Sequence, residues 1–95
     1  MKTETIRLES GNVTGYCIDL SNAPLLVLQA KKGYLMCGYL NMSAANKLGD
    51  IAGRVIGVKT FTDMLNTTLL EVSEKAKDIG LHEGMTGKEF LNALC

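Results

Sequence analysis

The chain has 95 residues, of which ten are basic and ten are acidic, so its formal net charge is zero and its pI is near 6.5. A neutral chain without long like-charge runs has no electrostatic footprint for nucleic acid or for an anionic membrane surface. Its 46% hydrophobic and 21% charged residues exclude a disordered chain and predict one folded domain over 1–95.

The N-terminal residues Met1–Thr5 lack the apolar segment of a secretory signal, and no stretch of about 18 apolar residues could span a membrane. Cys17, Cys37 and Cys95 are odd in number and show no CxxC spacing, so we expect free thiols in a cytoplasmic protein. The one histidine, His82, completes no recognised ligand spacing, and we expect no metal and no cofactor.

The N-terminal forty residues predict β-strands. Residues 3–8 alternate between apolar and polar and form a first strand, followed by turn chemistry at Gly11-Asn12. Residues 13–20 form a second strand. The loop that follows ends in Pro24, which can begin a third strand without losing a needed N–H group.

Residues 25–41 hold the most informative pattern, two apolar runs joined by the turn Lys31–Gly33. Neither run alternates, and a strand that is apolar on both sides lies in a sheet whose two faces are both covered. With the first two strands, these runs predict an antiparallel four-stranded meander.

The next segment, 42–56, carries Ala45, Leu48, Ala52 and Val55 at helical spacing. It predicts a helix with Ser43 as N-cap and Gly57 just past its end, and Asn41 is a second capping residue. The competing interpretation, a fifth strand over 52–58, stays open.

Further helices are predicted to the C-terminus. Thr60 and Asp63 cap a short helix over 61–65. A helix over 69–79 ends at Gly80-Leu81, although residues 67–72 are rich enough in β-formers to be a strand instead. Thr86 and Glu89 form the capping box of a last helix. The predicted fold class is α+β, a four-stranded sheet followed by three or four helices packing on it.

Assembly follows from this arrangement. One helical layer covers one face of the sheet, and no remaining segment is long enough to cover the other. We therefore expect the chain to self-associate through a symmetric interface. The alternative is that the helices divide between both faces.

Candidate chemistry is sparse. Cys37 is a possible nucleophile, but nothing local links it to His82, and free cysteine is among the most buried residue types. The segment 53–60 lacks the spacing of a phosphate-binding loop. Arg54, Lys59 and Thr60 could still hold an anion where the following helix begins.

Three segments carry a family resemblance: KGYLMCGYLN at 32–41, GVKT at 57–60 and GMTGKE at 84–89. Over residues 24–94 the chain resembles the YunC-like family of small bacterial and archaeal proteins, a family of unknown function. The resemblance implies a cytosolic α/β-type protein and transfers no reaction, cofactor or functional residue. It does direct attention to the matching positions, which are Cys37, Gly38, Asn41, Gly57, Lys59 and Thr60.

Two function classes remain. The first is a self-associating binding or assembly module without catalytic activity, which the missing catalytic spacing and the two-sided apolar strands favour. The second is a small enzyme or anion-binding protein with a site near Cys37 and the Gly57–Thr60 turn, for which Asn41, Arg54, Lys59 and Thr60 are candidate ligand contacts.

Overall fold

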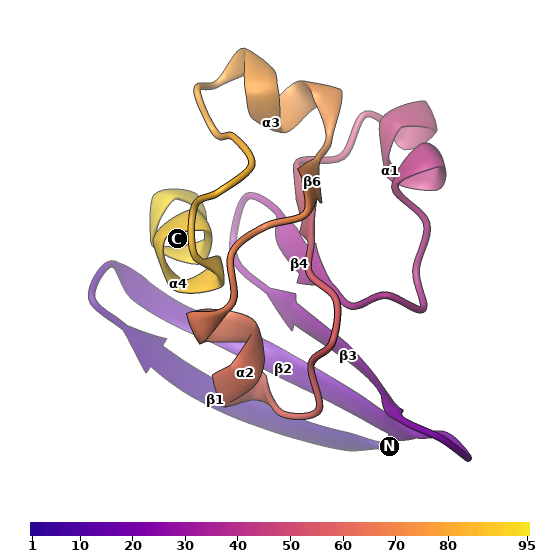
Figure 1. The fold of residues 1–95 in the computed structure, drawn as a ribbon. Coiled ribbons are helices and arrows are strands. Elements are labelled where there is room, and N and C mark those ends of the chain that lie inside the picture. Colours follow the sequence, from indigo (N-terminus) through magenta and orange to yellow (C-terminus); the bar gives the residue numbers. More distant parts are fainter.

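The computed structural model describes residues 1–95 and contains one six-stranded sheet and four helices (Figure 1). The fold class is therefore α+β, with two more strands than the sequence predicts. In chain order the elements are β1 (Lys2–Leu8), β2 (Gly11–Asp19), β3 (Pro24–Gln29), β4 (Tyr34–Met36), α1 (Met42–Leu48), β5 (Ala52–Arg54), α2 (Phe61–Asn66), β6 (Glu71–Val72), α3 (Glu74–Asp78) and α4 (Gly87–Leu94).

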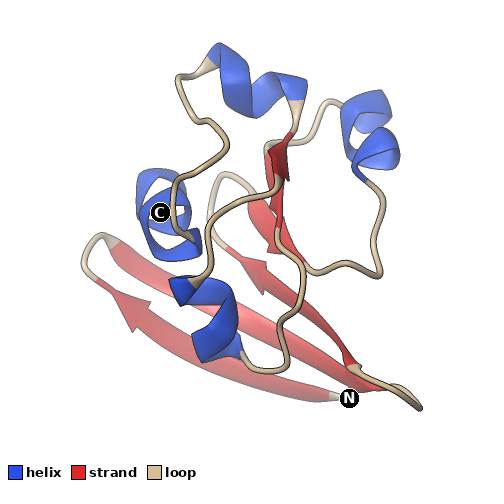
Figure 2. Cartoon of the chain, viewed as in Figure 1, coloured by secondary structure: helices blue, strands red, loops and turns tan.

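The strands lie in the sheet in the order of the sequence, from β1 to β6. All neighbours are antiparallel except β4 and β5, which run parallel and are joined by α1 as a crossover. The meander is thus confirmed for β1–β4, and the sheet continues beyond it. Figure 2 shows β1, β2 and β3 as separate long strands in the lower part of the view, with the shorter strands above them.

Two neighbouring rows of paired residues define the faces of the sheet. Register places one row on the first face and the next row on the second face, because successive side chains of a strand point to opposite sides. The first row is Gly15, Leu28, Leu35, Gly53 and Val72, all buried. The second row is Tyr16, Val27, Met36, Arg54 and Glu71.

Helices α2 and α4 pack on the first face, and glycines in that row admit their aromatic rings. A Cβ on Gly15 would lie 2.7 Å from the Phe61 ring of α2, and one on Gly53 would lie 3.1 Å from the Phe90 ring of α4. The main core, 17 buried residues, lies between these helices and the sheet. Phe90 is completely buried within it.

Helix α1 packs on the second face. Met42 and Ala45 of α1 form a separate small core with Met36 and Ala52 of the sheet. The helices therefore divide between the faces, which is the alternative that the sequence left open. Over β2 and β3 the second face keeps partly exposed apolar side chains, and we call Tyr16, Ile18, Leu25 and Val27 the uncovered face.

The helix predicted over 42–56 is too long. It ends at Leu48 because Gly49, with φ 76°, turns the backbone into the left-handed region. Residues 52–54 then pair with β4, so the strand interpretation of 52–58 is correct for its first three residues, and residues 55–58 belong to a loop. The N-cap is Asn41, whose side chain accepts the Ser43 N–H, and Gly57 lies in a loop rather than at a helix end.

The helix predicted over 69–79 is also too long. The backbone N–H groups of Leu70 and Ser73 donate to the β5 carbonyls of Arg54 and Ala52, which makes residues 71–72 an edge strand. Helix α3 begins only after Ser73, its N-cap. The strand interpretation of 67–72 is therefore correct for its last two residues.

Three predicted helix ends are confirmed. Thr60 caps α2 by accepting the Asp63 N–H, and Thr86 and Glu89 form the complete capping box of α4. Gly80 and Leu81 end α3 with the paired backbone hydrogen bonds of a Schellman motif. None of the four helices is long and apolar enough to cross a lipid bilayer.

Candidate functional site

Two loops leave the sheet at the same end of its strands. Because β4 and β5 are parallel, the loop after β4 (37–41) and the loop after β5 (55–60) both begin at the carboxyl ends of their strands. The start of β3 lies at the same end of the sheet, since β3 is antiparallel to β4. Ligands of open α/β sheets bind in the crevice outside the carboxyl ends of parallel strands.

A cavity of ≈ 300 Å³ lies between these loops. Its volume is at the lower end of the range for small-molecule sites. The residues that line it come from all three segments: Ala23, Pro24, Cys37, Gly38, Tyr39, Gly57, Val58 and Lys59. We call it the loop cavity. It brings together two candidate residues, Cys37 and Lys59, that lie 22 positions apart in the sequence.

The loop cavity is bordered by unused hydrogen-bond donors. The backbone N–H groups of Gly38, Tyr39, Gly57 and Val58 have no acceptor within the protein. Val58 is only 7% exposed, and buried backbone N–H groups are nearly always paired. Gly57 has φ 71°, a left-handed conformation of the kind that turns backbone N–H groups toward a common anion.

Lys59 is the only charged residue in the cavity lining. Its ammonium group takes part in none of the three ion pairs of the protein. No carboxylate and no histidine line the cavity. Backbone donors and one free cation without a counter-charge make the cavity complementary to an anion.

Cys37 contributes to the cavity wall but belongs to the main core. It is 2% exposed, and its Sγ accepts the Leu26 N–H at 3.3 Å. Cys17 lies on the other side of β3 and also pairs with Leu26, so the two cysteines are separated by a strand. His82 bonds the Glu83 carbonyl in an exposed turn and does not line the cavity.

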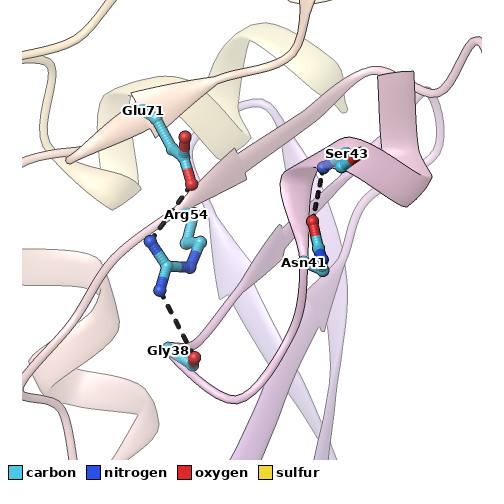
Figure 3. Close-up of polar contacts among 5 residues, drawn as sticks. All are labelled: Gly38, Asn41, Ser43, Arg54 and Glu71. Atoms are coloured by element: carbon cyan, nitrogen blue, oxygen red, sulfur yellow. Dashed lines mark hydrogen bonds and ion pairs between the residues drawn. The ribbon is translucent and has the colours of Figure 1, made fainter. Parts of the chain in front are cut away.

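Arg54 and Asn41 lie in an adjoining groove of ≈ 380 Å³, lined by residues 38–42 with Arg54 and Glu71. We call it the arginine groove, and it shares Gly38 and Tyr39 with the loop cavity. Arg54 Nη1 bonds Glu71 Oε1 at 3.1 Å, and Nη2 lies 3.4 Å from the Gly38 carbonyl oxygen (Figure 3). Asn41 Oδ1 is committed to the Ser43 N–H at 2.7 Å.

Thr60 lines neither hollow. Its hydroxyl accepts the Asp63 N–H as the cap of α2. The Asp63 carboxylate in turn accepts the Lys59 N–H at 3.1 Å, so this short helix already has an anion at its N-terminus.

The sequence alone does not indicate three of the lining residues, Ala23, Pro24 and Glu71. Ala23 and Pro24 read as an ordinary loop, and nothing local shows that they face residues 57–59. Glu71 lies opposite Arg54 across β5 and β6. Opposite charges are the signal that could have paired them, but only once both strands were assigned. No cluster of three or more His, Cys, Asp or Glu side chains is placed to hold a metal ion.

Comparisons with known proteins agree with this fold. The family model described as a domain of unknown function (DUF1805) matches residues 36–94, which include both loops. The uncharacterized protein YunC of Bacillus subtilis is 32% identical over 90 residues, which span 90% of this chain and 89% of that protein. The crystal structure of TA1206, a protein of unknown function from Thermoplasma acidophilum, superposes with a TM-score of 0.93 at 41% identity and covers 99% of this chain and 92% of that one.

Proposed function

We propose, from the premise that this chain belongs to the DUF1805 family, that the protein binds a small organic anion in the loop cavity. No reaction is established for the relatives described above, so the argument rests on this chain's own residues. The carrying observation is that four of the residues lining a single cavity have backbone N–H groups without acceptors, and a fifth is a lysine without an ion pair.

The apolar walls of the cavity indicate the chemistry of the uncharged part of the ligand. Ala23, Pro24 and Val58 are apolar, and Tyr39 adds an aromatic ring. A volume of ≈ 300 Å³ accommodates a ligand of about ten non-hydrogen atoms, if each takes roughly the space of a water molecule. The proposed ligand is a carboxylate or phosphate whose charge meets Lys59 and whose apolar part lies against Pro24.

The lining also favours binding over catalysis. General acid–base chemistry needs a titratable group within hydrogen-bond reach of the reacting atoms. The cavity presents neither a carboxylate nor His82, so no acid–base partner lies beside its titratable side chains, Cys37, Tyr39 and Lys59. We therefore propose a binding module rather than an enzyme.

Titration of ¹⁵N-labelled protein with benzoate and with inorganic phosphate tests the proposal. We expect saturable shifts of the Gly38, Tyr39, Gly57 and Val58 amides, which benzylamine, a cation of similar size, does not produce. Lys59→Gln should weaken binding about fivefold to tenfold, since it removes one charge-assisted contact. Lys88→Gln, which changes an exposed lysine of α4, is the matched control.

Two results would contradict anion binding in the loop cavity. The first is the absence of saturable shifts with either anion. The second is saturable binding that Lys59→Gln and Lys88→Gln weaken equally, because that would reflect net charge rather than a site.

A second candidate function, self-association, is favoured by the uncovered face. Ile18 remains 40% exposed, and Leu25 and Val27 beside it are partly exposed on the same face. Contiguous exposed apolar side chains mark interaction surfaces. Two copies of a chain with equal numbers of acidic and basic residues repel one another little. We propose that a second copy covers this face.

A further inference from the structure

We infer that Arg54 is a positioning residue for the loop cavity: it holds the Gly38–Tyr39 peptide so that the Tyr39 N–H is presented to the bound anion. The inference rests on the proposed function for the role of that N–H. It gives the arginine groove a role. The groove adjoins the loop cavity at Gly38 and Tyr39, and anion binding in the cavity does not itself involve the groove.

The first step is the contact itself. The Arg54 guanidinium lies between two acceptors, Glu71 on β6 and the Gly38 carbonyl in the loop after β4 (Figure 3). The Glu71 bond, at 3.1 Å, is the shorter of the two and is an ion pair across neighbouring strands. Glu71 therefore fixes the guanidinium, and the guanidinium in turn holds the loop.

The second step follows from peptide geometry. In a trans peptide the C=O and the following N–H point in opposite directions, and this chain contains no cis peptide bond. The Gly38 carbonyl is drawn toward Arg54 in the arginine groove. The Tyr39 N–H of the same peptide therefore points away from Arg54. Gly38 and Tyr39 line both hollows, so the direction away from the groove leads to the loop cavity.

The third step explains why the peptide needs to be held. Gly38 is exposed and lacks a Cβ, so local sterics restrict its backbone less than that of any other residue. A Cβ at this position would meet only the Ile56 side chain, at ordinary contact distances of 3.4 Å from Cγ2 and 4.0 Å from Cβ. Packing therefore does not fix the orientation of the peptide, and the hydrogen bond from Arg54 supplies what packing does not.

The arrangement carries a cost that a merely structural ion pair would avoid. Arg54 Nε is buried and has no hydrogen-bond partner. An unsatisfied buried donor is unfavourable, and native proteins hold few of them. With Nε left without a partner, Nη1 can bond Glu71 while Nη2 bonds the Gly38 carbonyl. Both bonds together are what positioning of the loop requires.

The test uses Arg54→Met, which keeps an unbranched side chain of the size of the aliphatic part of arginine and removes all of the hydrogen-bond donors. In the free protein we expect changes of the Gly38 carbonyl ¹³C and Tyr39 ¹⁵N chemical shifts, together with broadening of the Tyr39 amide as the peptide gains freedom. Affinity for benzoate should fall about fivefold, the effect of losing one well-placed donor. Arg7→Met, which changes an exposed arginine of β1, is the matched control.

A second variant, Glu71→Gln, covers the case in which Arg54→Met does not fold. It keeps an acceptor for Nη1 but removes the charge, so smaller changes of the same two resonances are expected. Arg54→Lys should restore part of the affinity, because its ammonium group can reach one acceptor at a time.

The outcomes separate the two proposals. A folded Arg54→Met protein with unchanged Gly38 and Tyr39 resonances overturns the positioning role, and so does unchanged benzoate affinity. If Glu71→Gln alone is folded and leaves both resonances unmoved, the positioning role is overturned as well. Failure of the wild-type protein to bind any anion overturns the proposed function, while the resonances of the free variants still show whether Arg54 holds the peptide.

Discussion

The hydroxyl of Tyr34, at the start of β4, donates a 2.7 Å hydrogen bond to the carboxylate of Asp50, which follows α1. This bond closes the β4–α1–β5 crossover at the end away from the loop cavity. Backbone bonds support it, because the Tyr34 N–H donates to the Ile51 carbonyl and the Asp50 N–H to the Ala45 carbonyl. The parallel pairing that builds the candidate site is therefore held at its amino-terminal end, opposite the loop cavity.

Tyr34→Phe should lower the free energy of unfolding by about 1–2 kcal/mol at neutral pH, because it removes a hydrogen bond to an ionised group. Chemical denaturation measures the change. Tyr39→Phe is the control, since the exposed Tyr39 hydroxyl has no hydrogen-bond partner in the protein. Equal stability of Tyr34→Phe and the wild-type protein would show that the bond contributes nothing.

The same hydroxyl predicts a pH dependence. Burial, and then the hydrogen bond and charge of Asp50, raise the pKa of Tyr34 from 10.0 to about 12. The folded protein thus keeps this proton after the unfolded chain has lost it, so the contribution to stability is complete below pH 10 and is lost as the pH rises toward 12. Tyrosinate absorbance should show one late-titrating tyrosine that Tyr34→Phe removes; uniform titration of all three tyrosines would contradict the assignment.

Cys37 should react with alkylating reagents far more slowly than Cys17 or Cys95 in the native protein. Cys37 is 2% exposed, whereas the other two thiols are partly exposed. Its modification therefore requires local opening of the sheet. Mass spectrometry of partially alkylated protein identifies the order, with the protein in denaturant as the reference. Modification of native Cys37 at the rate of the unfolded chain would show a reactive site rather than a core residue.

Gly87→Ala should destabilise the protein by about 3 kcal/mol, the upper range for overpacking a core. A Cβ at this first residue of α4 would overlap the Met64 carbonyl oxygen of α2 and lie 2.8 Å from Leu35 Cδ2. Lys88→Ala, one residue later and exposed, should change stability by less than about 0.5 kcal/mol. Thermal unfolding of both variants provides the comparison, and similar melting temperatures would contradict the close contact of α2 and α4.

Self-association should depend on Ile18. We expect light scattering to show the wild-type protein as an oligomer at high micromolar concentration and Ile18→Lys as a monomer, because the new charge would be buried in the interface. Ile79→Lys changes a similarly exposed isoleucine, 55% against 40%, at the end of α3, and should leave the oligomer intact. A monomeric wild-type protein would refute assembly through the uncovered face.

Local signals in the sequence predicted a large part of this fold. The alternation of residues 3–8, the turn at Lys31–Gly33 and the capping box of Thr86 and Glu89 are decided within a few residues of one another. Strands β5 and β6 were uncertain because they contain three residues and two residues, too few to show a period. They are strands because β4 offers a partner to β5 and β5 offers one to β6.

The candidate site also combines residues that the sequence indicates locally with contacts that only the folded chain creates. The sequence selected Cys37, Gly57 and Lys59 by residue type and turn chemistry, and the structure places all three around the loop cavity. It could not place Pro24 in that wall, nor pair Arg54 with Glu71, since each contact joins segments that approach only when the strands assemble. Asn41 was correctly chosen as a helix cap, whereas its place in the arginine groove depends on Arg54.

The sequence by itself therefore determined the N-caps of α2 and α4, the end of α3 at Gly80, the turns, the first four strands and the presence of apolar surface on both sides of the central hairpin. These features depend on backbone preferences and side-chain periods that act over a few residues. The tertiary structure alone decided that β4 and β5 run parallel, that α1 covers part of the second face, and that two loops enclose one cavity. Those outcomes depend on hydrogen bonds and contacts between distant segments, which local preference cannot specify.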